Sequence, residues 1–262
     1  MRALWPPVKQ PVVGMVHLLP LPGAPRFEGS LNEVRVRALA DAEALAEGGV
    51  HALMLENFGD VPFYPATVPS HVVACMTALA CEVHRRVNLP LGINVLRNDG
   101  RAALGVAVAC GAQFIRVNVL CGSRVADQGL IHGIAHDLLR DRQALGADVR
   151  IFADVDVKHS ASLAPRSLSD EVSDTLHRGL ADALIVSGTG TGRPTNPEHL
   201  RAVKTAAGGT PVFIGSGVTI DNISSYRAEA DGFIIGTAFK PAGDPGQPVD
   251  VSRVRALVSA LK

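Results

Sequence analysis

Two aspartates and one lysine interrupt an apolar segment in the middle of the chain. Asp154, Asp156 and Lys158 are separated by two positions each. Alternate residues of a strand share one face, so all three are expected to point the same way. A carboxylate beside a lysine can remove a proton next to a carbonyl while the other group stabilises the oxyanion. We predict that Asp156 is the general base and that Lys158 is its electrophilic partner.

Other polar residues stand near the ends of apolar segments, where parallel strands would deliver them to a site. Glu56 and His17 are further candidates for catalysis, together with Asp154. The segment 57–65 is too long and too aromatic for a simple connection, so it is expected to close over a site. Isolated buried charges are costly and must pair or meet a ligand. The candidates for substrate binding are Asn57, Asn94, Arg116, Asn118 and Ser187.

Several of these residues also have a structural interpretation. Arg116 and Asp154 could form a salt bridge inside the fold, and His17 could be a core histidine satisfied by its neighbours. Lys158 could instead form a Schiff base, although the flanking aspartates are expected to keep it protonated. Asp154, Asp156 and His17 could hold a divalent metal, but they follow no close-spaced ligand motif. We therefore predict no cofactor.

Three glycine-rich turns follow short apolar runs between residues 181 and 240. Glycine lets the backbone approach a ligand, and free N–H groups at such turns suit an anion. In a (β/α)8 barrel, the loops after the seventh and eighth strands are the usual phosphate site. The alternative is that the glycines only form tight turns. The predicted phosphate-binding residues are Gly188, Gly190, Gly215, Ser216, Gly217, Gly236 and Thr237.

Apolar runs with strand character alternate with segments of helical periodicity along the whole chain. The expected strands cover residues 11–18, 51–56, 91–96, 113–119, 149–157, 183–186, 211–214 and 232–235. The expected helices cover residues 31–48, 72–87, 99–110, 130–145, 168–180, 196–206, 220–227 and 251–261. Strict alternation with short connections predicts a closed parallel sheet. We expect an N-terminal leader over residues 1–10 and a single α/β domain, a (β/α)8 TIM barrel of the phosphate-binding type, over residues 11–262.

The composition excludes several classes of protein. The 262 residues are 47% hydrophobic and 19% charged, which is typical of one globular domain. Lysine plus arginine equals aspartate plus glutamate at 25 each, and no basic run indicates nucleic-acid binding. No apolar run approaches the roughly 20 residues of a transmembrane segment. The four cysteines form no Cys-x-x-Cys pair, which favours free thiols and a cytoplasmic location.

Six runs together resemble the BtpA/SgcQ family. They are Val13–Gly23, Leu55–Phe63, Gly92–Asp99, Phe114–Asn118, Asp154–His159 and Ser187–Gly190. The resemblance extends from about residue 11 to 260 and implies a TIM-type fold of the ribulose-phosphate-binding kind. The family is named for photosystem I accumulation in cyanobacteria, where it is described as a membrane-associated biogenesis factor. Members also occur in organisms without photosynthesis, some beside sugar-uptake genes, and the resemblance implies no assigned catalytic residue.

We therefore expect an enzyme with isomerase, epimerase or lyase chemistry that acts on a phosphorylated sugar or nucleoside-like small molecule. Homo-oligomerisation is compatible with this expectation. The alternative is a non-catalytic assembly factor related to photosystem I, for which the resemblance allows peripheral membrane association. No basic amphipathic helix that would dock on a membrane is recognisable. A purely structural barrel would leave the polar strand ends unexplained, and fold alone does not choose among these functions.

Overall fold

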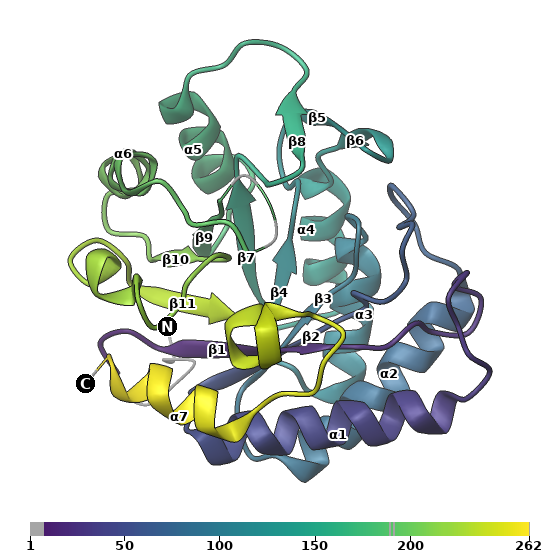
Figure 1. The fold of residues 1–262 in the computed structure, drawn as a ribbon. Coiled ribbons are helices and arrows are strands. Elements are labelled where there is room, and N and C mark those ends of the chain that lie inside the picture. Colours follow the sequence, from purple (N-terminus) through teal and green to yellow (C-terminus); the bar gives the residue numbers. More distant parts are fainter. Residues whose placement is uncertain (1–7, 189, 191, 262) are drawn as a thin grey trace.

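A closed barrel of eight parallel strands forms the centre of the computed structural model, which describes residues 8–188, 190 and 192–261 (Figure 1). Around the barrel the order is β1-β11-β10-β9-β7-β4-β3-β2, and β2 pairs with β1. The expected (β/α)8 barrel is therefore confirmed, while residues 1–7 of the expected leader lie outside the described residues. The barrel strands are β1 (Val12–His17), β2 (Ala52–Glu56), β3 (Leu91–Asn94), β4 (Phe114–Val117), β7 (Arg150–Val155), β9 (Ala183–Val186), β10 (Val212–Ile214) and β11 (Gly232–Ile235).

Helices surround the barrel on its outer side (Figure 1). The first begins where the Ser30 hydroxyl accepts a hydrogen bond from the Glu33 N–H, and it ends at Gly49, whose φ of 91° only glycine adopts readily. The α-helices in the described chain are α1 (Leu31–Gly48), α2 (Ser70–Arg86), α3 (Gly100–Cys110), α4 (Ala135–Ala144), α5 (Leu168–His177), α6 (Pro197–Ala207) and α7 (Val251–Ser259).

The helix expected over residues 220–227 is wrong in type. Only a short 3₁₀ helix, η1 (Ile223–Tyr226), forms there. Asn222 explains the difference, because its side chain accepts from the Thr219 N–H and donates to the Gly217 carbonyl, both at 2.8 Å. These local bonds compete with a regular helix. Two further 3₁₀ turns follow β11, namely η2 (Thr237–Phe239) and η3 (Pro241–Gly243).

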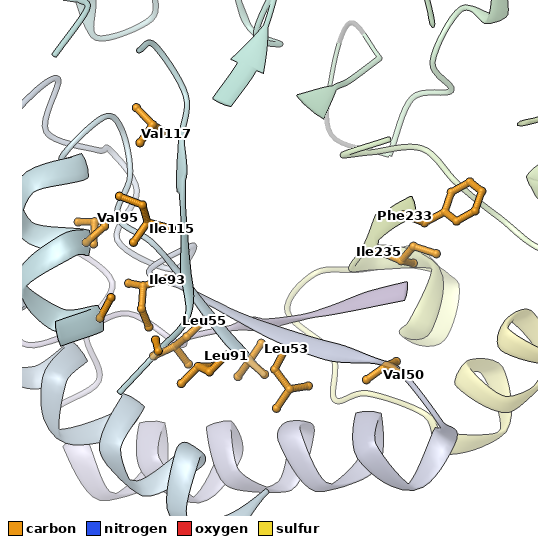
Figure 2. Close-up of a cluster of buried hydrophobic side chains, with 14 of the residues drawn as sticks. Val50, Leu53, Leu55, Leu91, Ile93, Val95, Ile115, Val117, Phe233 and Ile235 are labelled. Atoms are coloured by element: carbon orange, nitrogen blue, oxygen red, sulfur yellow. The ribbon is translucent and has the colours of Figure 1, made fainter. Parts of the chain in front are cut away.

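Alternation along the strands separates an outer core from an inner one. Outward side chains such as Leu53 and Leu55 pack toward the helices (Figure 2). Inward side chains such as Met54 and Phe114 fill the barrel instead. The same alternation carries the next inward position of each strand to the barrel mouth. In this way Met54 is followed by Glu56 and Phe114 by Arg116, and Met15 and Phe152 likewise precede His17 and Asp154.

A small antiparallel sheet at the mouth was not expected from the sequence. Its strands are β5 (Ser123–Ala126), β6 (Gly129–His132) and β8 (Ser160–Ser162), in the order β6-β5-β8. The expected loop 120–129 and the start of the expected helix 130–145 therefore form a hairpin, and α4 begins only at Ala135. Gly129, the first residue of β6, has a φ of 92°, and a left-handed residue just after the turn is typical of such hairpins.

Candidate functional site

Two cavities, the first and the second lobe, lie at the carboxyl ends of the barrel strands and share four lining residues. Glu56, Phe58, Arg116 and Lys158 line both of them. The first lobe, with a volume of about 40 Å³, is also lined by Met15, His17, Gly192, Gly215, Ser216, Gly217, Val218, Ile234, Ile235, Gly236 and Thr237. The second lobe, with a volume of about 290 Å³, is also lined by Val61, Phe63, Leu96, Arg97, Asn118, Asp127, Gln128 and His159.

The turn after β10 gives the first lobe the features of an anion site. The backbone N–H groups of Gly217 and Val218 donate to no acceptor among the described residues. Gly217 has a φ of 71°, and consecutive free N–H groups around such a residue form an anion-binding concavity. A Cβ atom on Gly217 would lie 1.9 Å from the Arg193 carbonyl oxygen, so this position requires glycine. Of the seven residues predicted to bind phosphate, five line this lobe: Gly215, Ser216, Gly217, Gly236 and Thr237.

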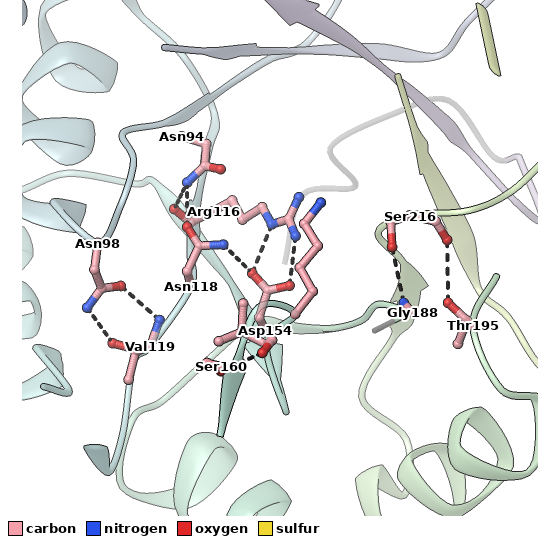
Figure 3. A network of polar contacts seen from close by, with 12 residues as sticks. Asn94, Asn98, Arg116, Asn118, Val119, Asp154, Ser160, Gly188, Thr195 and Ser216 are labelled. Atoms are coloured by element: carbon pink, nitrogen blue, oxygen red, sulfur yellow. Dashed lines mark hydrogen bonds and ion pairs between the residues drawn. The ribbon is translucent and has the colours of Figure 1, made fainter. Parts of the chain in front are cut away.

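Gly188 and Gly190, from the turn after β9, line neither lobe. The Gly188 N–H donates to the Ser216 hydroxyl oxygen at 3.1 Å (Figure 3). A Cβ atom on Gly188 would lie 2.1 Å from the Arg193 carbonyl oxygen. This turn therefore supports the turn after β10, and its own lobe-lining residue is Gly192, which sequence reasoning did not single out.

Buried polar side chains form a hydrogen-bonded network at the carboxyl ends of β3, β4 and β7 (Figure 3). The Arg116 guanidinium donates to both carboxylate oxygens of Asp154, at 2.8 and 2.9 Å. The Asn118 amide donates to Asp154 at 2.9 Å, and the Asn94 amide donates to Asn118 at 3.2 Å. Asp154 is thus fully engaged, so the structural interpretation of the Arg116–Asp154 pair fits the geometry. Arg116 lines both lobes even though its charge is balanced by Asp154.

Glu56 and His17 lie beside each other at the ends of β2 and β1. The His17 Nε2 and Glu56 Oε1 atoms are 3.7 Å apart, and both side chains are buried. Burial raises the pKa of Glu56 against the lowering effect of Arg116 and Lys158. Burial also lowers the pKa of His17 well below its usual value, and the positive charge of Lys240 adds to this. The mouth therefore combines a carboxyl group that binds protons more readily than usual with a neutral imidazole.

Lys158 faces the same cavity without an ion pair. Among the described residues, no carboxylate lies within 4.0 Å of its ammonium group. Burial lowers the pKa of Lys158 to about 8, and the positive charge of Arg116 adds to the effect. The negative charges of Glu56 and Asp154 oppose this lowering of the pKa. Neither flanking aspartate pairs directly with Lys158, because Asp154 is bonded to Arg116 and Asp156 to Arg124.

Asp156 does not share a face with Asp154 and Lys158, contrary to the expectation from spacing. The strand ends at Val155, and Asp156 has a φ of 51°, which breaks the two-residue alternation. Its side chain is 52% exposed, lines neither lobe, and pairs with Arg124 of β5. Arg124 also pairs with Glu171 of α5 at 3.1 Å. Asp156 therefore anchors the small sheet to the barrel.

Several buried polar atoms at the mouth have no hydrogen-bond partner. Among the described residues these include His17 Nδ1, Asn94 Oδ1, Ser187 Oγ and Gln128 Oε1. Unsatisfied buried polar groups are costly, and functional sites are where they are tolerated. Asn57 differs, since its side chain accepts from the Leu96 N–H at 2.7 Å and thereby holds the loop after β3.

Sequence reasoning found part of the second lobe, namely Glu56, Arg116, Asn118 and Lys158, and missed Arg97, Asp127 and Gln128. Arg97 lies three residues after β3, inside a run quoted only for its family resemblance. Asp127 and Gln128 come from the turn of the β5–β6 hairpin, within a segment that was expected to be a plain loop. Phe58 stacks on His17 with ring centroids 4.6 Å apart, and it belongs to the segment 57–65 that was expected to cover a site.

The described residues form neither a metal-binding cluster nor a membrane-spanning helix. No cluster of three or more histidine, cysteine, aspartate or glutamate side chains is arranged there to hold a metal ion. No helix in the described part of the chain is long and apolar enough to cross a membrane.

Comparisons with known proteins identify relatives along nearly the whole chain. The model of the BtpA family matches residues 8–262. The photosystem I biogenesis protein BtpA of Synechocystis is 49% identical over 251 residues, covering 96% of this chain and 88% of that protein. An uncharacterized protein of Thermococcus kodakarensis is 46% identical, covering 97% of this chain and 96% of that protein.

Solved structures show the same fold at low sequence identity. KGPDC from Streptococcus mutans superposes with a TM-score of 0.60 at 12% identity, covering 97% of this chain and 98% of that chain. Orotidine 5'-phosphate decarboxylase from Pyrococcus horikoshii superposes with a TM-score of 0.59 at 13% identity, covering 95% and 98%. At identities this low, the superpositions establish a shared TIM-barrel fold and leave the ligand and the reaction open.

Proposed function

The chain belongs to the BtpA family, and from that premise and the geometry of the mouth we propose that it is an enzyme acting on a phosphorylated small molecule by proton transfer next to a carbonyl. One observation carries the proposal. A buried carboxyl group with a raised pKa and a lysine with a lowered one line the first lobe together with the Gly217 turn. Within the described residues, the lysine has no carboxylate partner and the Gly217 and Val218 N–H groups have no acceptor. Strongly perturbed groups of this kind cluster at functional sites.

In the proposed mechanism the ligand phosphate lies against Gly217 and Val218, and the reacting carbon lies over Glu56. The Glu56 carboxylate removes the proton, because a raised pKa makes it a stronger base than an ordinary carboxylate. The Lys158 ammonium donates to the developing oxyanion, and its pKa of about 8 lets it do so while charged at neutral pH. His17, held neutral, can position either group. This chemistry fits isomerases, epimerases and lyases.

The experiment that tests the proposal follows carbon-bound protons directly. The protein is incubated in D₂O with phosphorylated aldoses and ketoses, and NMR monitors loss of the signal from the proton next to the carbonyl. Exchange with a phosphosugar but not with its unphosphorylated counterpart is the expected result. Absence of exchange with every phosphorylated carbonyl compound, while inorganic phosphate still binds, would overturn the assignment of proton-transfer chemistry.

The pH dependence of activity follows from the two perturbed groups. Catalysis needs Glu56 deprotonated and Lys158 protonated, so kcat/KM should rise through a pKa above the usual carboxyl value and fall near pH 8. Lys158→Arg should move the alkaline limb upward, since arginine stays charged. Kinetic profiles of both proteins check this. Unchanged alkaline limbs would assign that limb to another group, and borohydride trapping of a substrate on Lys158 would indicate a Schiff base instead.

Asp156 provides a matched negative control inside the same segment. Because its carboxylate pairs with Arg124 outside both lobes, Asp156→Asn should change kcat/KM by less than about threefold. Asp154→Asn should lower it far more, because it breaks the buried pair with Arg116. Steady-state kinetics of the two variants, with melting curves, distinguish the positions. A large loss of kcat in a well-folded Asp156→Asn protein would restore it as the general base.

A second candidate function rests on the name of one relative. The Synechocystis protein is named for photosystem I biogenesis, and that name describes assembly rather than a reaction. Under this reading the chain is a non-catalytic assembly factor, and it should co-fractionate with membranes and retain a protein partner. If Glu56→Gln complements loss of this gene as well as the wild-type protein does, the assembly function is favoured over catalysis.

A further inference from the structure

Arg97 is a buried cation that the proposed mechanism does not use. Arg97 lines the second lobe, and the residue is only 5% exposed. Its Nη2 atom donates to the Lys158 carbonyl oxygen at 2.7 Å. No carboxylate among the described residues lies within 4.0 Å of the guanidinium. The charges of Asp154, Asp127 and Glu56 favour the charged guanidinium, but none of them pairs with it directly. A direct counterion supplied by a ligand would therefore stabilise this buried charge.

The backbone around Arg97 is held firmly, so the orientation of its side chain is part of the fold. The Asn57 side chain accepts from the Leu96 N–H at 2.7 Å. The Arg97 N–H donates to the Tyr64 carbonyl at 3.0 Å. The Asn98 side chain accepts from the Val119 N–H at 2.8 Å and donates to the Val119 carbonyl at 3.0 Å. Both neighbours of Arg97 are thus fixed by asparagine side chains, as expected for a positioned recognition residue.

The second lobe offers room and further polar contacts for a ligand. Its volume of about 290 Å³ exceeds that of the first lobe, and the two share Glu56, Phe58, Arg116 and Lys158 as lining residues. Gln128 also lines the second lobe, and its Oε1 atom is buried with no hydrogen-bond partner in the described part of the chain. A ligand that extends from the glycine turn to Arg97 would therefore pass over Glu56 and Lys158.

We propose that Arg97 binds a carboxylate group of the ligand, so that the substrate is a small phosphorylated carboxylic acid held at both ends. The planar guanidinium matches a carboxylate in two parallel hydrogen bonds. A second phosphate fits less well, because the lobe also contains the carboxyl groups of Glu56 and Asp127, which repel a dianion more than a monoanion. This inference rests on the proposed phosphate site in the first lobe.

The test compares phosphorylated acids with phosphorylated alcohols of the same length. The pairs are 3-phosphoglycerate with glycerol 3-phosphate, 4-phosphoerythronate with erythritol 4-phosphate, and 6-phosphogluconate with sorbitol 6-phosphate. Calorimetry gives the Kd of each, and inorganic phosphate reports on the first lobe alone. In at least one pair the acid should bind roughly tenfold or more tightly than the alcohol, the effect of one charge-assisted bidentate contact.

Arg97→Gln should abolish that preference and leave the Kd of the alcohol and of inorganic phosphate unchanged. Arg97→Lys keeps the positive charge but loses the two parallel donors of the guanidinium, so it should retain part of the preference for the acid. Arg101→Gln, an exposed arginine on α3, is the control expected to behave like the wild-type protein. Should Arg97→Gln fail to fold, the Kd values of the acid and alcohol pairs for the wild-type protein and for Arg97→Lys still test the inference.

Two failures are distinguishable. If alcohols and inorganic phosphate bind but no acid is preferred at any length, or if Arg97→Gln keeps the preference, the inference about Arg97 is overturned and the phosphate site stands. If neither inorganic phosphate nor any phosphorylated probe binds, the proposed function fails, and the inference fails with it.

Discussion

Glu56→Gln is expected to lower kcat by roughly 100- to 10,000-fold, the usual effect of losing a general base. The amide has nearly the same shape as the carboxyl group but cannot accept a proton from carbon. KM should not rise, because the amide removes a negative charge that lines the first lobe and repels the phosphate. Deuterium exchange measured by NMR and a calorimetric Kd for the same ligand together separate chemistry from binding.

The same substitution should leave the protein as stable as the wild type, or more stable. Burial raises the pKa of Glu56, so the folded state retains a proton that the unfolded state has already released. The free energy of unfolding therefore falls as pH rises from the unfolded pKa to the folded one, and it stays lowered above that window. Glu56→Gln removes this penalty. Thermal melts at pH 5 and pH 8 should show a smaller difference for the variant.

Glu28→Gln, at an exposed loop position, is the matched control and should alter neither kcat nor the melting temperature. Lost activity combined with unchanged or greater stability is the signature of a residue kept for function at the expense of stability. Retained exchange activity in Glu56→Gln would contradict the mechanism and direct attention to Lys158 as the base.

The barrel could be predicted from the sequence because all of its strands follow one physical rule. Buried parallel strands are apolar on both faces, so runs such as Ala183–Val186 and Gly232–Ile235 were placed at their observed bounds. The same two-residue period delivered Glu56 and Arg116 to the mouth. The rule failed at Asp156, where a positive φ ends the period one residue beyond the strand. Backbone conformation of this kind leaves little trace in a single sequence.

Arg97, Asp127 and Gln128 of the second lobe were not predicted from the sequence, for a different reason. The walls of this lobe come from segments distant in sequence, so the burial of Arg97 against the Lys158 carbonyl depends on a tertiary contact. The hairpin that supplies Asp127 and Gln128 carries apolar residues that also fit a helical period. The turn at Gly217 was found because glycine is required there for a steric reason that operates locally as well as through Arg193.

Substitution of Gly217 would test the phosphate site poorly. Any side chain there meets the Arg193 backbone and takes up a strained φ, so lost binding could reflect a displaced turn. Thr237 offers a cleaner position, because it lines the first lobe at the start of η2 and is half-buried. An added carboxylate there changes the charge of the lobe while the backbone has no reason to move.

Thr237→Asp is expected to weaken binding of inorganic phosphate and of phosphorylated ligands by about 100-fold or more, from repulsion between like charges a few ångströms apart. Thr237→Asn, with the same shape and no charge, should weaken it only several-fold. Thr205→Asp, on the exposed face of α6, controls for an added negative charge elsewhere. Kd values from calorimetry at low and high salt measure all three.

Salt dependence and the Asp–Asn difference together decide what the first lobe binds. Screening should recover part of the loss in Thr237→Asp if the penalty is electrostatic. Equal losses in the Asp and Asn variants would exclude charge repulsion as the cause, and the Thr237→Asp result would then give no support for an anion in the first lobe. Tight phosphate binding by Thr237→Asp would remove the first lobe as the phosphate site, and with it the alignment of the substrate across Glu56 and Lys158.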